Sequence, residues 1–151
     1  MSVDAFLAHV TTKIAEKMGN ALAKGMISGK GKPGESDSHK PQPKGIVTAL
    51  EAEDATPQVV EYETSITYKN MTDVMAKIKS GYAKGGAIYA TNTTIWGELA
   101  NIVDGNNKPM FIPDVTLGGV GRIFGLVVKE EDGMKDGEVL FGNVSKGYAV
   151  N

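Results

Sequence analysis

The segment VDAFLAHVTTKIAEKMGNALAK (residues 3–24) carries large apolar side chains at every third or fourth position. This spacing predicts a helix with one apolar stripe, because an α-helix repeats about every 3.6 residues. Ser2 is placed to cap the helix and Gly25 to end it. Such a helix would be about 33 Å long, whereas a compact domain of this size has a radius of gyration of only about 15 Å. We therefore expect a rod that crosses a whole domain or extends beyond it, as in subunits that pack side by side.

Residues 25–44 are predicted to form a polar loop that Pro33, Pro41 and Pro43 keep free of regular structure. The stretch GKGKPGES (29–36) has the composition of a phosphate-binding loop. The spacing G-x-x-x-x-G-K-[ST] is absent, however, and a helix precedes the stretch where the motif requires a strand. The stretch GGVGRIFG (118–125) also lacks the helix that must follow the glycine turn of a dinucleotide site. We predict no cofactor at either stretch.

The rest of the chain mixes short strands and helices, which predicts the α+β class. Predicted strands cover 45–50, 59–68, 87–91, the segment RIFGLVVKE (122–130) and the segment EVLFG (138–142). Predicted helices cover 71–86, with Thr72 as N-cap and Gly85-Gly86 at the end, and 93–105, with Ile95, Leu99 and Ile102 facing inward. We see no internal repeat.

The composition excludes several classes of function. The chain has no cysteine, which removes disulfides and zinc–thiolate sites. Its net charge of −2 gives no electrostatic footprint of a DNA- or RNA-binding protein. No apolar run approaches the roughly 20 residues of a membrane span. His9, His39 and the acidic clusters at 51–54 and 130–132 lack the arrangement of a catalytic triad or a calcium loop. We predict that the protein is not an enzyme and binds no metal.

Glycine, proline and a few neighbours recur in a distinctive order from about residue 3 to residue 150. Gly29, Gly31, Pro43 and Gly45 follow the long helix, and Asp104, Gly105 and Pro113 follow the strand and helix of 87–105. The last members of the series are Gly125, Val128, Gly142 and Tyr148. With these motifs in this order, the sequence resembles the major capsid proteins of tailed bacteriophages and prophages, which have the Hong Kong 97-type fold.

The resemblance implies a division of the chain into two parts. Residues 1–44 would be the spine helix and exit loop of the peripheral domain. Residues 45–151 would be mostly the axial domain, with strands that return to the peripheral domain. Relatives carry an N-terminal arm and a β-hairpin before the spine helix, and further strands after the final Gly-Tyr. We therefore expect this chain to be a fragment, truncated at both ends.

The resemblance also implies a structural function. Copies of the protein would assemble into pentamers and hexamers of an icosahedral shell that packages double-stranded DNA without reading its sequence. Its partners would be other copies of itself, a scaffold, a maturation protease and a portal, with no membrane. The protein would reside in the virion, and in the host cytoplasm during assembly.

Two alternatives stay open. An encapsulin-like compartment shell shares the fold but encloses enzymes. A small nucleotide-binding enzyme would use the loop at 29–36, and saturable stabilisation by ATP or GTP, lost in Lys30→Ala and Lys32→Ala, would reveal it.

Overall fold

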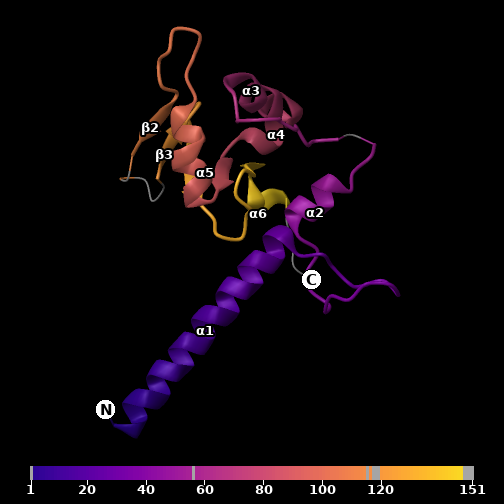
Figure 1. Cartoon of the computed structure of the whole chain (residues 1–151), viewed down its shortest axis with the longest axis vertical. Coiled ribbons are helices and arrows are strands. Elements are labelled where there is room, and N and C mark those ends of the chain that lie inside the picture. The colour runs from indigo at the N-terminus through magenta and orange to yellow at the C-terminus, as the bar shows by residue number, and fades with distance from the viewer. Residues whose placement is uncertain (1, 56, 115, 117–119, 148–151) are drawn as a thin grey trace. The chain divides into compact units, whose positions relative to one another are not determined.

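The computed structural model describes residues 2–55, 57–114, 116 and 120–147. Its contacts divide the chain into two compact units, Met1–Ala49 and Leu50–Asn151. The first unit is built on one long helix, and the second on a five-stranded sheet with short helices (Figure 1). This mixture of helix and sheet confirms the predicted α+β class.

The predicted long helix is α1 (Val3–Ser28). The Ser2 hydroxyl caps it by accepting a hydrogen bond from the Ala5 N–H at 3.3 Å. The helix does not end at Gly25 as predicted but continues to Gly29, whose N–H donates to the Gly25 carbonyl at 2.9 Å. Gly25 instead makes room for a neighbour, because a Cβ there would lie 3.3 Å from Pro43 Cδ. This glycine therefore serves close packing rather than helix termination.

The predicted strand at 45–50 is wrong, because this segment forms the helix α2 (Ile46–Glu51). The Ala49 N–H donates to the Gly45 carbonyl at 3.0 Å, which is a helical hydrogen bond. A short apolar run is compatible with a helix or a strand. None of the described strands of the sheet pairs with residues 45–50.

The sheet of the second unit has the order β2-β3-β4-β1-β5. β1 runs parallel to β4, and the other neighbouring pairs are antiparallel. The strands are β1 (Ala87–Ala90), β2 (Phe111–Pro113), β3 (Gly121–Ile123), β4 (Leu126–Glu130) and β5 (Leu140–Gly142). The predicted strands at 87–91 and 138–142 thus correspond to β1 and to the shorter β5.

The predicted strand RIFGLVVKE is two strands joined by a tight turn. Phe124 (φ 51°) and Gly125 (φ 76°) both have positive φ, which a two-residue hairpin turn matching the sheet twist requires. Phenylalanine rarely adopts this conformation. The Phe124 ring packs edge-on against the Tyr68 ring, with centroids 5.2 Å apart, and this contact helps to hold the turn.

The helices of this unit are shorter than predicted. They are α3 (Tyr68–Lys77), α4 (Ser80–Ala83), α5 (Asn92–Gly97), the 3-10 helix η1 (Leu99–Asn101) and α6 (Val144–Gly147). Thr67, not Thr72, caps α3 through a reciprocal pair of hydrogen bonds with Asn70. The predicted helix 71–86 breaks at Ile78, whose backbone is extended and whose side chain packs on the core. The predicted helix 93–105 is divided between α5 and η1.

The predicted strand at 59–68 is also wrong. Residues 57–66, which we call the strap, contain neither helix nor strand. The Tyr62 hydroxyl donates to the Gly137 carbonyl at 2.7 Å, the Ile66 N–H donates to Glu98 Oε2 at 3.2 Å, and the Ile66 side chain is buried. Partial burial, with the Glu98 carboxylate nearby, raises the pKa of Tyr62 above its ordinary value. The apolar alternation therefore marks anchoring side chains rather than a strand.

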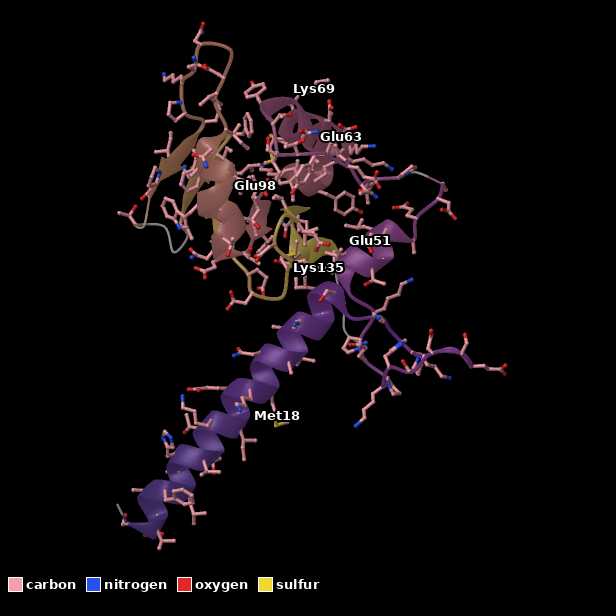
Figure 2. The ribbon with its side chains drawn as sticks, in the orientation of Figure 1. Met18, Glu51, Glu63, Lys69, Glu98 and Lys135 are labelled. Carbon is pink, nitrogen blue, oxygen red and sulfur yellow. The ribbon has the colours of Figure 1, made fainter. Side chains whose placement is uncertain are left out.

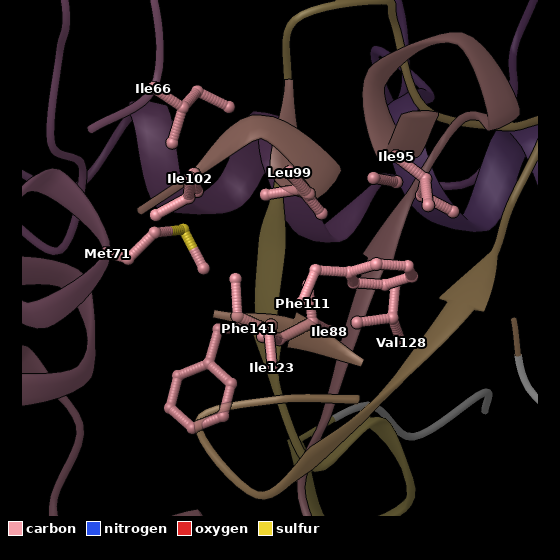
Figure 3. Packing of buried hydrophobic residues seen from close by; sticks show 11 residues of the cluster. Ile66, Met71, Ile88, Ile95, Leu99, Ile102, Phe111, Ile123, Val128 and Phe141 are labelled. Carbon is pink, nitrogen blue, oxygen red and sulfur yellow. The ribbon is translucent and has the colours of Figure 1, made fainter. Parts of the chain in front are cut away.

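The core lies between the sheet and the α5–η1 segment (Figure 3). Ile88, Ile123 and Val128 of the sheet are fully buried, as are Ile95 and Leu99 of the two helices. Ile102 is almost fully buried too, which confirms the predicted inward face of this segment.

A buried pair of threonines fastens the loop before β5 to the start of α5. Thr91 caps α5, and its hydroxyl donates to Asp136 Oδ1 at 2.5 Å. The Thr94 hydroxyl lies 2.9 Å from that of Thr91 and accepts the Gly137 N–H at 2.9 Å. These bonds satisfy polar groups that would otherwise be buried without partners.

We predict that Thr94→Val lowers the free energy of unfolding by about 1–3 kcal/mol, because it leaves the Gly137 N–H without its acceptor. Thr93→Val is the matched control: it makes the same change one residue earlier, on an exposed side chain with no hydrogen bond in the described structure. Chemical denaturation of both variants is the measurement. Equal stabilities would contradict the assignment.

Candidate functional site

The four motif residues that follow the long helix come together in space. Gly31 N–H donates to the Pro43 carbonyl at 3.3 Å, and Gly45 N–H donates to the Gly29 carbonyl at 2.8 Å. The backbones of Lys30 and Lys44 form an antiparallel bridge. We call these two segments, residues 29–31 and 43–45, the clasp. It returns the chain to the end of α1 and closes off the loop between them.

Glycine is required in the clasp for steric reasons. A Cβ at Gly45 would lie 2.5 Å from both the Gly29 nitrogen and the Ile27 carbonyl oxygen. A Cβ at Gly29 would overlap the carbonyl oxygens of Pro43 and Gly25. Because the obstacles are backbone atoms, no change of rotamer can relieve them. Both glycines are therefore part of how the clasp closes.

The clasp also explains the glycine- and lysine-rich stretch at 29–36. The N–H groups of Gly29 and Gly31 donate to the carbonyls of Gly25 and Pro43, so they do not point at an open phosphate site. Gly34 and Asp37 close a separate small turn, in which Gly34 N–H donates to Asp37 Oδ2 at 2.9 Å. Across the described residues, no group of three or more acidic or histidine side chains could hold a metal ion. The described helices include none long and apolar enough to cross a membrane.

Asp104 and Gly105 form a turn between η1 and β2. One oxygen of the Asp104 carboxylate accepts the N–H groups of Asn106 at 2.8 Å and Lys108 at 2.9 Å. These hydrogen bonds hold the pKa of Asp104 below its usual value, since they favour the charged form. The bridge between Val103 and Pro109 completes the turn. Asp104 is therefore a structural organiser of this loop.

The remaining motif residues are spread over the sheet rather than gathered at one site. Pro113 ends the edge strand β2, and Gly125 occupies the β3–β4 turn. Val128 is fully buried in β4 opposite Ile88, and Gly142 pairs with Ala87. Tyr148 lies outside the described residues.

The largest exposed apolar surface of the first unit is one face of α1, and Figure 2 shows Met18 projecting from this helix into solvent. We call it the α1 face, and its side chains are between 52% and 74% exposed. Its members are Val3, Phe6, Leu7, Ile14, Met18 and Leu22. A contiguous apolar stripe of this kind usually marks an interaction surface.

Trp96 both contacts the core and lies partly at the surface. Its ring meets the buried Phe111 edge-on, with centroids 5.5 Å apart. The side chain is nevertheless 47% exposed. Tryptophan in this situation can contribute to a contact between proteins.

Sequence reasoning missed the polar anchors around Glu98, Tyr62 and Gly137. The two residues of each contact are far apart in the sequence, so no local sequence pattern predicts these contacts. Thr91 could have been found, because a threonine just before a helix is a common N-cap.

We predict opposite effects for two glycine substitutions. Gly45→Ala should lower the free energy of unfolding of the first unit by roughly 1–3 kcal/mol, because the new Cβ meets backbone atoms. Gly19→Ala, in the middle of α1 with open space around it, should raise helix stability by about 0.5–1 kcal/mol. Thermal unfolding followed by the circular dichroism of the helix tests both. A stabilising Gly45→Ala would show that the clasp does not close as described.

The comparisons with known proteins agree with this architecture. A chain from the solved "capsid of native GTA particle computed with C5 symmetry" matches with a TM-score of 0.58 at 17% identity, which shows a shared fold. The match covers 90% of this chain and 50% of that chain, so this chain spans half the length of the capsid chain. None of the curated proteins matches. The family model described as the phage capsid family matches residues 2–151. The chain therefore belongs to the phage capsid family.

Proposed function

We propose that this chain is a structural shell subunit of a tailed phage or prophage. Copies associate into pentamers and hexamers, and these join into a closed icosahedral shell around double-stranded DNA. The observation that carries the proposal is the α1 face, because a helix with this much exposed apolar surface is built to be covered. Membership of the phage capsid family supports other copies of the chain as the partner.

The α1 face has the energetics of a reversible contact. Burying the surface that its side chains still expose would contribute roughly 5–9 kcal/mol. Association costs an estimated 4–15 kcal/mol in lost translational, rotational and side-chain freedom. One such face therefore gives a weak contact, and a stable shell needs several contacts per subunit. Weak individual contacts also let misplaced subunits leave during assembly.

The two units fit a subunit that has two parts with different structural roles. We propose that residues 1–44 form the spine helix and exit loop of the peripheral domain. Residues 45–151 would form mostly the axial domain, which meets other copies around the capsomer axis. The division of contacts near residue 49 supports this boundary. The motif residues from Gly29 to Gly142 would act by shaping bends and loops, with no catalytic role.

The remaining partners follow from the same role. A scaffold and a portal would guide assembly in the host cytoplasm, and a maturation protease would act on the assembled particle before it becomes the virion shell. The net charge of −2 suits a wall that encloses DNA without gripping it tightly. Electron microscopy of the complete product of this gene tests the proposal directly. Closed shells containing DNA would support it, and shells filled with an enzyme would favour an encapsulin-like compartment.

We predict that Ile14→Asp weakens self-association at least tenfold, because it places a charge within the apolar contact. Thr12→Asp is the matched control. It adds the same negative charge to α1 two residues away, on the opposite side of the helix. Sedimentation velocity over a concentration series measures the association of each variant. Both variants should unfold at similar temperatures, as neither side chain packs on the core.

Two results would count against this part of the proposal. If Ile14→Asp and Thr12→Asp weakened association equally, the α1 face would not be the contact. If the unsubstituted chain stayed monomeric at every concentration and salt condition, its role as a self-assembling subunit would be wrong.

A further inference from the structure

We propose that the α1 face of one copy docks the strap (residues 57–66) of a second copy, with the lysines of α1 facing the glutamates of the strap. The inference rests on the proposed self-association and names the two surfaces that meet. It depends on three features of the chain: how the strap is held, which charges it displays, and which charges border the α1 face.

The strap is fixed to its own unit in a way that turns its acidic side chains outward. Tyr62 is held by its hydrogen bond to the Gly137 carbonyl, and the Ile66 backbone by its bond to Glu98. Lys77 Nζ also donates to the Pro57 carbonyl at 2.9 Å. Glu61 and Glu63, on either side of the inward Tyr62, are both exposed. Figure 2 labels Glu63 of the strap and Glu98, whose carboxylate accepts the Ile66 N–H.

The strap displays unused negative charge beside apolar surface. Among the described residues, neither Glu61 nor Glu63 has an ion pair, and neither carboxylate accepts a hydrogen bond. Val59, two residues before Glu61, is 43% exposed. The strap therefore offers an apolar side chain and two free carboxylates from a backbone that is already ordered, so that little further entropy is lost on docking.

The α1 face has the opposite charge along one border. Lys13, Lys17 and Lys24 are four and seven residues apart, so they lie along one side of the helix. Lys13 pairs with Glu16 at 2.8 Å. In the described structure Lys17 and Lys24 have no acidic partner, and Lys17 lies one turn from Ile14 of the α1 face. An apolar stripe bordered by two free lysines fits an apolar segment that carries two free carboxylates.

The spacing of the charges is compatible with this pairing. Lys17 and Lys24 are separated by about 10 Å along the helix axis. Glu61 and Glu63 are at most about 7 Å apart along the chain. The long flexible lysine side chains span the difference.

The strap fits this border better than a second α1 does. In an antiparallel pair of α1 helices related by twofold symmetry, the lysine borders of both copies would face each other and repel. The strap presents charge of the opposite sign. Opposite charges at such a contact fix its register and partner more than they add affinity.

Charge reversal tests the pairing. Lys17→Glu with Lys24→Glu should weaken self-association by about tenfold, and Glu61→Lys with Glu63→Lys should do the same. When these two double variants are mixed, the glutamates placed on α1 of one protein meet the lysines placed on the strap of the other. The unchanged lysines of the second protein likewise meet the unchanged glutamates of the first, so the mixture should recover association. The chain that carries all four reversals should return to within about threefold of the original association, because opposite charges face each other again.

The matched control is Lys79→Glu with Lys84→Glu, which changes the net charge equally at exposed lysines without ion pairs in the described structure. It should leave association nearly unchanged. Sedimentation velocity at low and high salt is the readout, and the original association should weaken as salt rises.

Several outcomes would overturn the inference. If the four-reversal chain does not recover, Lys17 and Lys24 do not face Glu61 and Glu63. If charge reversal has no effect while Ile14→Asp still disrupts association, the α1 face has another occupant and the proposed function stands. If the lysine reversals lower only the binding of double-stranded DNA, the lysine border faces nucleic acid. A chain that never associates would defeat the proposed function and the inference together.

Discussion

The exposed apolar surface of the α1 face imposes the strongest physical requirement on this protein. The apolar side chains along this 26-residue helix contribute little hydrophobic stabilisation unless another surface buries them. The buried residues of α1 are Gly25 and Ile27, both near its end at the clasp. The helix therefore leaves most of its hydrophobic stripe exposed, and the natural way to cover it is contact with another molecule. A shell subunit has this property by necessity.

The clasp holds the end of α1 to the segment that follows the polar loop within the first unit. Here the chain returns to the last turn of α1 through backbone hydrogen bonds, and the absence of side chains at Gly29 and Gly45 lets the two segments touch. The polar residues between them are held in a closed loop, and α2 follows directly.

The second unit supplies order of another kind. Its core is small, and polar bonds between distant residues reinforce it: Thr94 to Gly137, Tyr62 to Gly137, and Glu98 to Ile66. These bonds give the strap a defined course although it has no regular secondary structure. An ordered irregular segment can present charges to a partner at low entropic cost, which is why anchoring and display occur together in the strap.

The amino-acid sequence predicts those features that depend on local spacing. The apolar period of 3–24 predicts α1, the run at 87–91 predicts β1, and Ile95, Leu99 and Ile102 predict the buried side of the α5–η1 segment. The order of glycines and prolines along the chain also indicates the phage capsid family. Whether residues 45–50 and 59–68 are strands depends on tertiary contacts, because a strand exists only when another strand is there to pair with it. Likewise, Gly25 signals a helix end in the sequence, but only the position of Pro43 shows that it serves packing. The exposed apolar stripe of α1 depends on both sequence and tertiary structure. The spacing of its residues creates the stripe, and the fold leaves it exposed.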